Sequence, residues 1–170
     1  MEAKKSLIAG VDEVGKGCLF GPVFAGAVIL SKANETNLLN QGLKDSKKLS
    51  HRQRLNLVPV IKQHSIAWSI GQASAREIDS IGIRKATEKA MLRALEKFSS
   101  PPDLILVDGI LPIRLWPGEQ KTQVRGESHF ASVAAPSVLA KETRDELSST
   151  ESLEVNEDPR RKRRRSSASS

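Results

Sequence analysis

Two apolar runs of the sequence end in carboxylates, a pattern typical of a divalent-cation site. Asp12 and Glu13 follow the run LIAGV, and Asp108 follows the run LILV. Hard cations such as Mg²⁺ take carboxylate oxygens as ligands. Two such cations about 4 Å apart can stabilise both the attacking and the leaving oxygen of phosphodiester cleavage. The residue types therefore indicate a metal-dependent nuclease site, provided that the chain brings the two acidic segments together.

A purely structural explanation fits one acidic segment better than the other. Asp108 stands before a glycine, and an Asp-Gly pair is favourable turn chemistry by itself. Asp12 and Glu13 are harder to explain without a cation, because two adjacent ionised acids at a buried strand end repel each other. Neighbours on a strand also point to opposite faces. Both acids can reach one site only if the strand ends there and Gly15 and Gly17 let the chain turn.

The elements that must position these acids are strands alternating with helices. Strands are predicted over 6–12, 22–31, 65–74 and 103–109, with a further one near 121–125, and helices over 50–63, 83–98 and 131–147. A short glycine-bearing link between the first two strands predicts an antiparallel hairpin. The last helix is expected to begin near Pro136, with that proline in its first turn. This order predicts an α/β fold with a mixed central β-sheet flanked by helices.

The composition places few further limits on function. The net charge of +7 over 170 residues is mostly due to the run RRKRRR at 160–165; without those six, the 27 basic residues fall to 21 against 20 acidic ones. The single cysteine, Cys18, excludes an internal disulfide and fits a reducing compartment. The apolar run at 23–30 is far shorter than the ~20 residues that span a bilayer. We expect a cytoplasmic monomer with no membrane association.

Several blocks of the sequence, taken in order, resemble ribonuclease HII, the type 2 ribonuclease H. They are DEVGKG (12–17), FGPV (20–23), LKDSKKLS (43–50), PDLILVDG (102–109), SVAAPSVLAK (132–141) and TRD (143–145). The resemblance implies a ribonuclease H-like fold and an endoribonuclease that hydrolyses the RNA strand of RNA–DNA hybrids. It also implies nicking of DNA at single embedded ribonucleotides, by two-metal-ion catalysis that leaves 5′-phosphate ends. The implied partners are RNA–DNA hybrid or ribonucleotide-containing DNA, and the implied role is in DNA replication and repair.

The resemblance also assigns site residues by position. It makes four acids the catalytic and Mn²⁺- or Mg²⁺-binding residues: Asp12, Glu13, Asp108 and Asp145. It assigns substrate binding to Gly15, Lys16 and Gly17, which match a loop that reads the ribose 2′-hydroxyl through its backbone, and to Ser46 and Lys47, which match a phosphate-contacting loop. The 2′-hydroxyl is the group that distinguishes RNA from DNA at a single position.

The resemblance weakens toward the C-terminus. The family continues past its last acid with more helix and a tyrosine, whereas this chain contains no tyrosine. We therefore expect a C-terminally truncated catalytic domain at 1–148 and a disordered tail with a basic block at 149–170. The alternative function is that of a truncated, inactive relative that at most binds nucleic acid through its basic tail. A third hypothesis is that the chain is another ribonuclease H-like nuclease or a recombinase.

Overall fold

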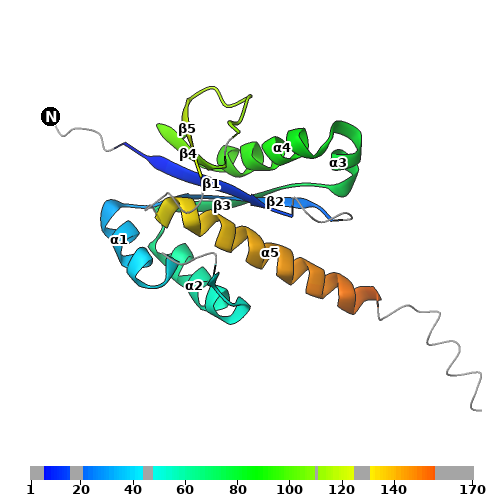
Figure 1. Cartoon of the computed structure of the whole chain (residues 1–170), viewed down its shortest axis with the longest axis horizontal. Coiled ribbons are helices and arrows are strands. Elements are labelled where there is room, and N and C mark those ends of the chain that lie inside the picture. The colour runs from blue at the N-terminus through cyan, green and yellow to red at the C-terminus, as the bar shows by residue number, and fades with distance from the viewer. Residues whose placement is uncertain (1–5, 16–20, 44–47, 110, 125–130, 156–170) are drawn as a thin grey trace, which may run out of the picture.

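A five-stranded mixed sheet forms the centre of the protein (Figure 1). The structure is a computed structural model that describes residues 6–15, 21–43, 48–109, 111–124 and 131–155, with side chains of the last helix up to Leu147. The strands are β1 (Ile8–Val14), β2 (Val23–Ile29), β3 (Ala67–Ala73), β4 (Leu104–Asp108) and β5 (Glu119–Gln123), in the spatial order β3-β2-β1-β4-β5. β1 pairs antiparallel with β2 and parallel with β4. The predicted hairpin and mixed sheet are therefore confirmed.

Helices cover both faces of this sheet (Figure 1). On one face lie α3 (Ala75–Ile81) and α4 (Ile83–Glu96), and on the other lie α1 (Lys32–Asn40), α2 (His51–His64) and α5 (Ala131–Val155). Each face has its own hydrophobic core, because successive side chains of a strand point to opposite sides. Val11 and Val107 pack with α4, whereas Val28 packs with α1, α2 and α5. The strands β1, β2 and β4 are thus largely buried between two helical layers.

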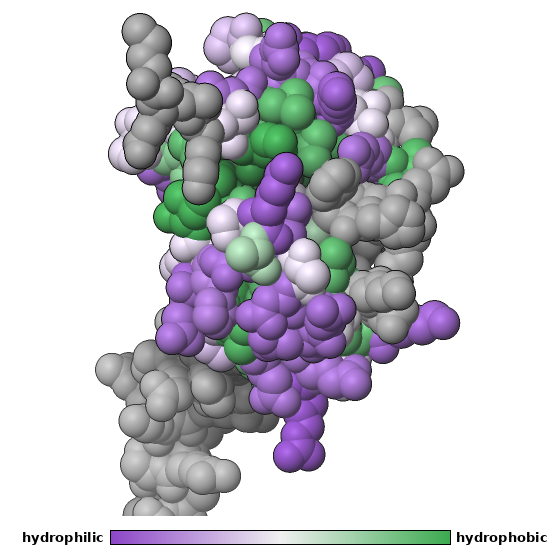
Figure 2. Space-filling model, turned by 90° about the vertical axis from the view of Figure 1, so that its left-hand side faces the viewer, coloured by the Kyte–Doolittle hydropathy of each residue, from purple (hydrophilic) through white to green (hydrophobic). Residues whose placement is uncertain are grey.

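Seen from the left-hand side of Figure 1, the lower half of the molecule, over α1 and α2, is mostly hydrophilic (Figure 2). Hydrophobic side chains are visible above it, on the side of the sheet that α4 covers. Within the described ranges, no helix combines the length and hydrophobicity needed to span a bilayer.

Glycines let α5 lie directly on the sheet. A Cβ on Gly10 of β1 would stand 1.4 Å from the carbonyl oxygen of Ser132, and one on Gly26 of β2 would stand 2.3 Å from that of Pro136. Non-bonded carbon and oxygen atoms do not approach so closely, so neither strand position accepts a side chain. The helix backbone consequently passes closely over β1 and β2, the strands that lead to the acidic segment.

Both predicted ends of the last helix were wrong. Pro136 lies inside α5 rather than in its first turn, since the helix already begins at Ala131. A proline inside a helix removes one hydrogen bond. Burial of Ser132, Val133 and Ala135 against the sheet offsets that loss. The helix also continues past Leu147 to Val155, because the sequence offers no glycine or proline stop before Pro159. Residues 156–170 of the predicted tail lie outside the described residues.

Two short helices were absent from the prediction. α1 begins after Ser31, whose hydroxyl accepts a hydrogen bond from the Asn34 amide at 3.3 Å. α3 begins with a capping box, in which Ser74 and Glu77 each accept from the other's backbone amide. Such caps are visible in a sequence, but neither helix has the long apolar stripe that identifies an amphipathic helix.

The close approach of α5 predicts that Gly10→Ala lowers the free energy of unfolding by about 2 kcal/mol or more, because the strand and the helix must move apart. Urea denaturation measures this loss. Gly21→Ala is the matched control, since nothing lies within 4 Å of the position its Cβ would take. Equal stability of the two variants would show that α5 does not pack against β1 as described.

Candidate metal centre

The strand register brings Asp12 and Asp108 together. β1 and β4 are parallel neighbours with Val11 opposite Val107, so the next positions along the two strands are Asp12 and Asp108. Val11 and Val107 point into the core beneath α4. By alternation, the two aspartates point toward the face that α5 covers. Two distant segments of the chain therefore deliver carboxylates to one end of the sheet.

Asp12 is the most deeply buried of the three acids at this end of the sheet. Its side chain is 6% exposed, and the backbone amide of Glu13 donates a hydrogen bond of 2.8 Å to its Oδ1. Burial, followed by the negative charges of Asp108 and Glu13, raises the pKa of Asp12 well above its ordinary value. Every neighbour that shifts this pKa raises it. The site thus concentrates negative charge, the condition under which a bound cation is most stabilising.

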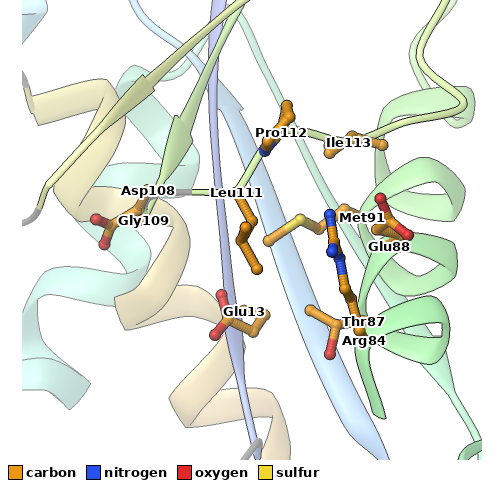
Figure 3. A pocket seen from close by; sticks show the side chains of 10 residues that line it. All are labelled: Glu13, Arg84, Thr87, Glu88, Met91, Asp108, Gly109, Leu111, Pro112 and Ile113. Carbon is orange, nitrogen blue, oxygen red and sulfur yellow. The ribbon is translucent and has the colours of Figure 1, made fainter. Parts of the chain in front are cut away.

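Glu13 and Asp108 are among the residues that line a cavity at the end of β1 and β4, on the side of α4. The carboxylate of Asp108 points away from this cavity, toward the face that α5 covers (Figure 3). The cavity holds about 190 Å³. Because a water molecule takes up about 30 Å³ of liquid, this volume accommodates a hydrated cation. Arg84, Thr87 and Glu88 of α4 form its opposite wall. The guanidinium of Arg114 pairs with Glu88 and lowers the pKa of that carboxyl.

The chemistry of these donors fits Mg²⁺ or Mn²⁺. Asp12, Glu13 and Asp108 offer only hard carboxylate oxygens, which such cations prefer. A cation bound among them would also relieve the electrostatic cost of burying Asp12. The geometric difficulty of adjacent acids on one strand is reduced at the strand end, where Asp12 interacts with Glu13 as well as with Asp108.

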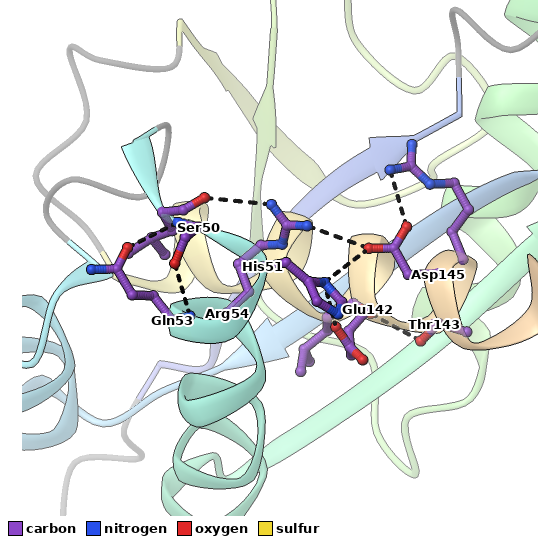
Figure 4. Close-up of polar contacts among 10 residues, drawn as sticks. Ser50, His51, Gln53, Arg54, Glu142, Thr143 and Asp145 are labelled. Atoms are coloured by element: carbon purple, nitrogen blue, oxygen red, sulfur yellow. Dashed lines mark hydrogen bonds and ion pairs between the residues drawn. The ribbon is translucent and has the colours of Figure 1, made fainter. Parts of the chain in front are cut away.

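The fourth predicted acid, Asp145, lies on α5 among basic residues (Figure 4). Its Oδ2 is 3.3 Å from the guanidinium of Arg54 and 3.5 Å from Nδ1 of His51, and its Oδ1 is 3.4 Å from the guanidinium of Arg144. His51 and Arg54 belong to α2, so this cluster joins two helices. The structure thus groups Asp12, Glu13 and Asp108 and gives Asp145 other named partners. Its role as a fourth ligand stays a prediction.

Of the predicted substrate-binding residues, only Gly15 lies among the described residues. Its φ of 105° is in the region that favours glycine, and a Cβ there would stand 2.8 Å from the carbonyl oxygen of Pro22. This bare backbone lies two residues beyond Glu13. Lys16, Gly17, Ser46 and Lys47 lie outside the described residues, and their assignments stay predictions.

A second group of polar residues surrounds Asp145. The sequence motifs do not single out its other members, His51, Arg54 and Glu142. Glu142 is buried, and burial is the main reason why its pKa is raised. The only sequence signal was the spacing of Glu142 and Asp145, which places both on one face of a helix. No sequence pattern connects either residue with α2, some 90 positions away.

Comparison with known proteins identifies relatives of the chain. Residues 9–161 match the family described as ribonuclease HII. Ribonuclease HII of Prochlorococcus marinus (strain NATL1A) is 89% identical over 147 residues, which cover 86% of this chain and 75% of that protein. Among solved structures, ribonuclease H2 from Pyrococcus horikoshii OT3 superposes with a TM-score of 0.76 at 25% identity, covering 89% of this chain and 78% of that one. The structure of the PCNA:RNase HII complex from Archaeoglobus fulgidus superposes with a TM-score of 0.74 at 25% identity. The match covers 92% of this chain and 85% of that chain.

The buried charge of Asp12 predicts a cation-dependent stability. Without divalent cations, Asp12→Asn should raise the free energy of unfolding by about 1 kcal/mol at neutral pH, because it removes an unfavourable buried charge. The gain should shrink as the pH falls through the raised pKa of Asp12 toward 3.8, since the parent protein then folds with this acid protonated. Thermal unfolding between pH 4 and pH 8 measures both effects.

Addition of Mn²⁺ or Mg²⁺ should make the parent protein more stable than Asp12→Asn, because the cation binds the parent more tightly. Asp79→Asn, on the exposed surface of α3, serves as the control and should change neither the pH dependence nor the cation response. An identical cation response of the parent and Asp12→Asn would contradict a metal centre at Asp12.

Proposed function

Because the chain belongs to the ribonuclease HII family, whose members are metal-dependent endoribonucleases acting on RNA–DNA hybrids, we propose that it also nicks DNA at single embedded ribonucleotides and uses two-metal-ion catalysis for both substrates. The observation that carries the proposal is the convergence of Asp12, Glu13 and Asp108 at the ends of two parallel strands. We place the reaction in the cytoplasm, in DNA replication and repair, and expect a monomer to perform it.

The proposed roles follow from the chemistry of each group. Asp12, Glu13 and Asp108 would hold the cations through carboxylate oxygens. Bound Mn²⁺ or Mg²⁺ would supply activation of water for in-line attack and stabilisation of the leaving 3′-oxygen. The protein itself mainly positions the scissile phosphate and balances charge, leaving a 5′-phosphate and a 3′-hydroxyl.

Substrate selection would depend on the loop that follows the acidic pair. Gly15, Lys16 and Gly17 would contact the ribose 2′-hydroxyl through the backbone, and Ser46 and Lys47 would contact phosphate. The positive φ of Gly15 supports the proposal, since only a residue without a side chain leaves the backbone bare at this point. A DNA strand lacks the hydroxyl and would forfeit this contact.

The motif TRD makes Asp145 the proposed fourth acid of the catalytic set. Its named partners, however, lie on α2 and α5. An activity assay of Asp145→Asn decides between a catalytic set of four acids and a set of three.

A cleavage assay tests the central acids. With Mn²⁺ or Mg²⁺, the parent chain should cut an RNA–DNA hybrid and a DNA duplex carrying one ribonucleotide, but not an all-DNA duplex. Asp108→Asn should reduce the rate by roughly 100-fold or more, because it removes a ligand of the cations that stabilise the transition state. Asp79→Asn should cut as the parent does, and EDTA should abolish cleavage. Salt-sensitive binding without cleavage by the parent would instead favour the inactive nucleic-acid-binding alternative.

A second assay tests the glycine loop. Gly15→Ala should lower cleavage of both substrates by about tenfold or more, because its Cβ would displace the backbone at Pro22. Gly42→Ala is the matched control, since Gly42 also has a positive φ, of 121°, but has open space around the position of a Cβ. Both variants should lose about 1 kcal/mol of stability, but only Gly15→Ala should lose activity. Equal activity of the two variants would remove this loop from substrate recognition.

A further inference from the structure

A second potential ligand set lies between α2 and α5. It includes Asp145, so this assignment is an alternative to the role of Asp145 as a fourth acid of the catalytic set. His51 is the first residue of α2, and Glu142 and Asp145 stand three positions apart on α5. One ligand atom from each of the three lies within 4.8 Å of the others. Figure 4 shows the imidazole of His51 facing both carboxylates. We propose that His51, Glu142 and Asp145 bind a divalent transition-metal cation of the Zn²⁺ or Co²⁺ type.

The buried carboxylate of Glu142 is the observation that points to a ligand. Its side chain is 7% exposed, and its Oε2 is inaccessible to solvent and accepts no hydrogen bond from the residues that the structure describes. This atom faces Nδ1 of His51 at 3.9 Å, too far for a hydrogen bond. A buried carboxylate oxygen without a donor is costly. A cation between Glu142 and His51 would provide the missing partner.

The distances suit a small coordination sphere. Zinc binds histidine nitrogen and carboxylate oxygen at about 2.0–2.2 Å, so neighbouring ligand atoms of a tetrahedral site stand about 3.3–3.6 Å apart. Nδ1 of His51 is 3.5 Å from Oδ2 of Asp145 and 3.9 Å from Oε2 of Glu142. The His51 side chain is 56% exposed, so it can make the small adjustment required and leaves a side open for water as a fourth ligand.

The donor set determines the class of cation. An imidazole nitrogen suits Zn²⁺, Co²⁺ and related transition metals, whereas Mg²⁺ prefers oxygen ligands and retains its waters. Asp12, Glu13 and Asp108 offer oxygen alone. The two proposed sites should therefore respond differently to the same metals, and this difference makes them separable by experiment.

Two arginines limit the strength of the proposed site. Arg54 lies 3.3 Å from Oδ2 of Asp145, and Arg144 lies 3.4 Å from Oδ1. A carboxylate has about four lone-pair positions, so Asp145 can accept from both arginines and still coordinate a cation. Such outer partners orient a ligand, but their positive charge weakens cation binding. We expect binding to be reversible and removable by EDTA.

Cobalt titration of the full chain tests the proposal, because tetrahedral Co²⁺ absorbs visible light far more strongly, and at longer wavelengths, than hydrated Co²⁺. The titration is made in the Asp108→Asn background, so that failure of the proposed nuclease centre does not affect the result. One equivalent of Co²⁺ should bind, Zn²⁺ should displace it, and excess Mg²⁺ should not. His51→Gln and Glu142→Gln should each weaken Co²⁺ binding by at least about tenfold.

His64→Gln is the matched control, since it removes an imidazole from the opposite end of the same helix. It should bind Co²⁺ as the background protein does. Circular dichroism shows whether each variant is folded, and Glu142→Gln keeps the size of the side chain. Absence of a visible Co²⁺ spectrum, or a spectrum unchanged in both folded ligand variants, would overturn the proposal.

Discussion

The structure depends on the burial of a carboxylate beside two others at one end of the sheet. Asp12 is almost fully enclosed, and Asp108 and Glu13 both make its ionisation harder. A folded protein gains no stability from such an arrangement, because each buried charge loses hydration and repels the next. The proposed binding site for divalent cations would explain why the unfavourable contact exists. The same repulsion would favour binding of a cation there.

The rest of the fold serves to hold these acids in register. Parallel pairing of β1 with β4 sets Asp12 opposite Asp108, and the two hydrophobic cores fix the sheet between its helical layers. Gly10 and Gly26 allow α5 to approach β1 and β2 without intervening side chains. Rigid strands position ligands more precisely than loops do. The acidic end of the sheet is therefore supported by two buried hydrophobic cores.

The two acidic clusters differ in how their charge is balanced. Around Asp12, all the neighbours that shift its pKa raise it. Around Asp145, two arginines and a histidine lie within 3.5 Å. A cation should consequently stabilise the first cluster far more than the second. Glu142 still favours a cation in the second cluster. Its buried Oε2 accepts no hydrogen bond from the described residues, although basic groups lie nearby. The two proposed sites thus differ in donor chemistry, in affinity and in the ions they should select.

The sequence by itself determined the alternation of strands and helices, the antiparallel hairpin and the family. It also predicted the acids at 12, 13 and 108 as site residues. These features depend on local periodicity, on turn residues and on ordered motifs, which a single chain displays directly. It could not determine where α5 begins and ends. Burial of the first turn outweighs the local effect of Pro136, and no local stop signal precedes Val155. Nor could it reveal that Asp145 meets His51 and Arg54. Only the packing of α2 against α5 brings together side chains some 90 residues apart, and pairing at that distance leaves no periodic trace in the sequence.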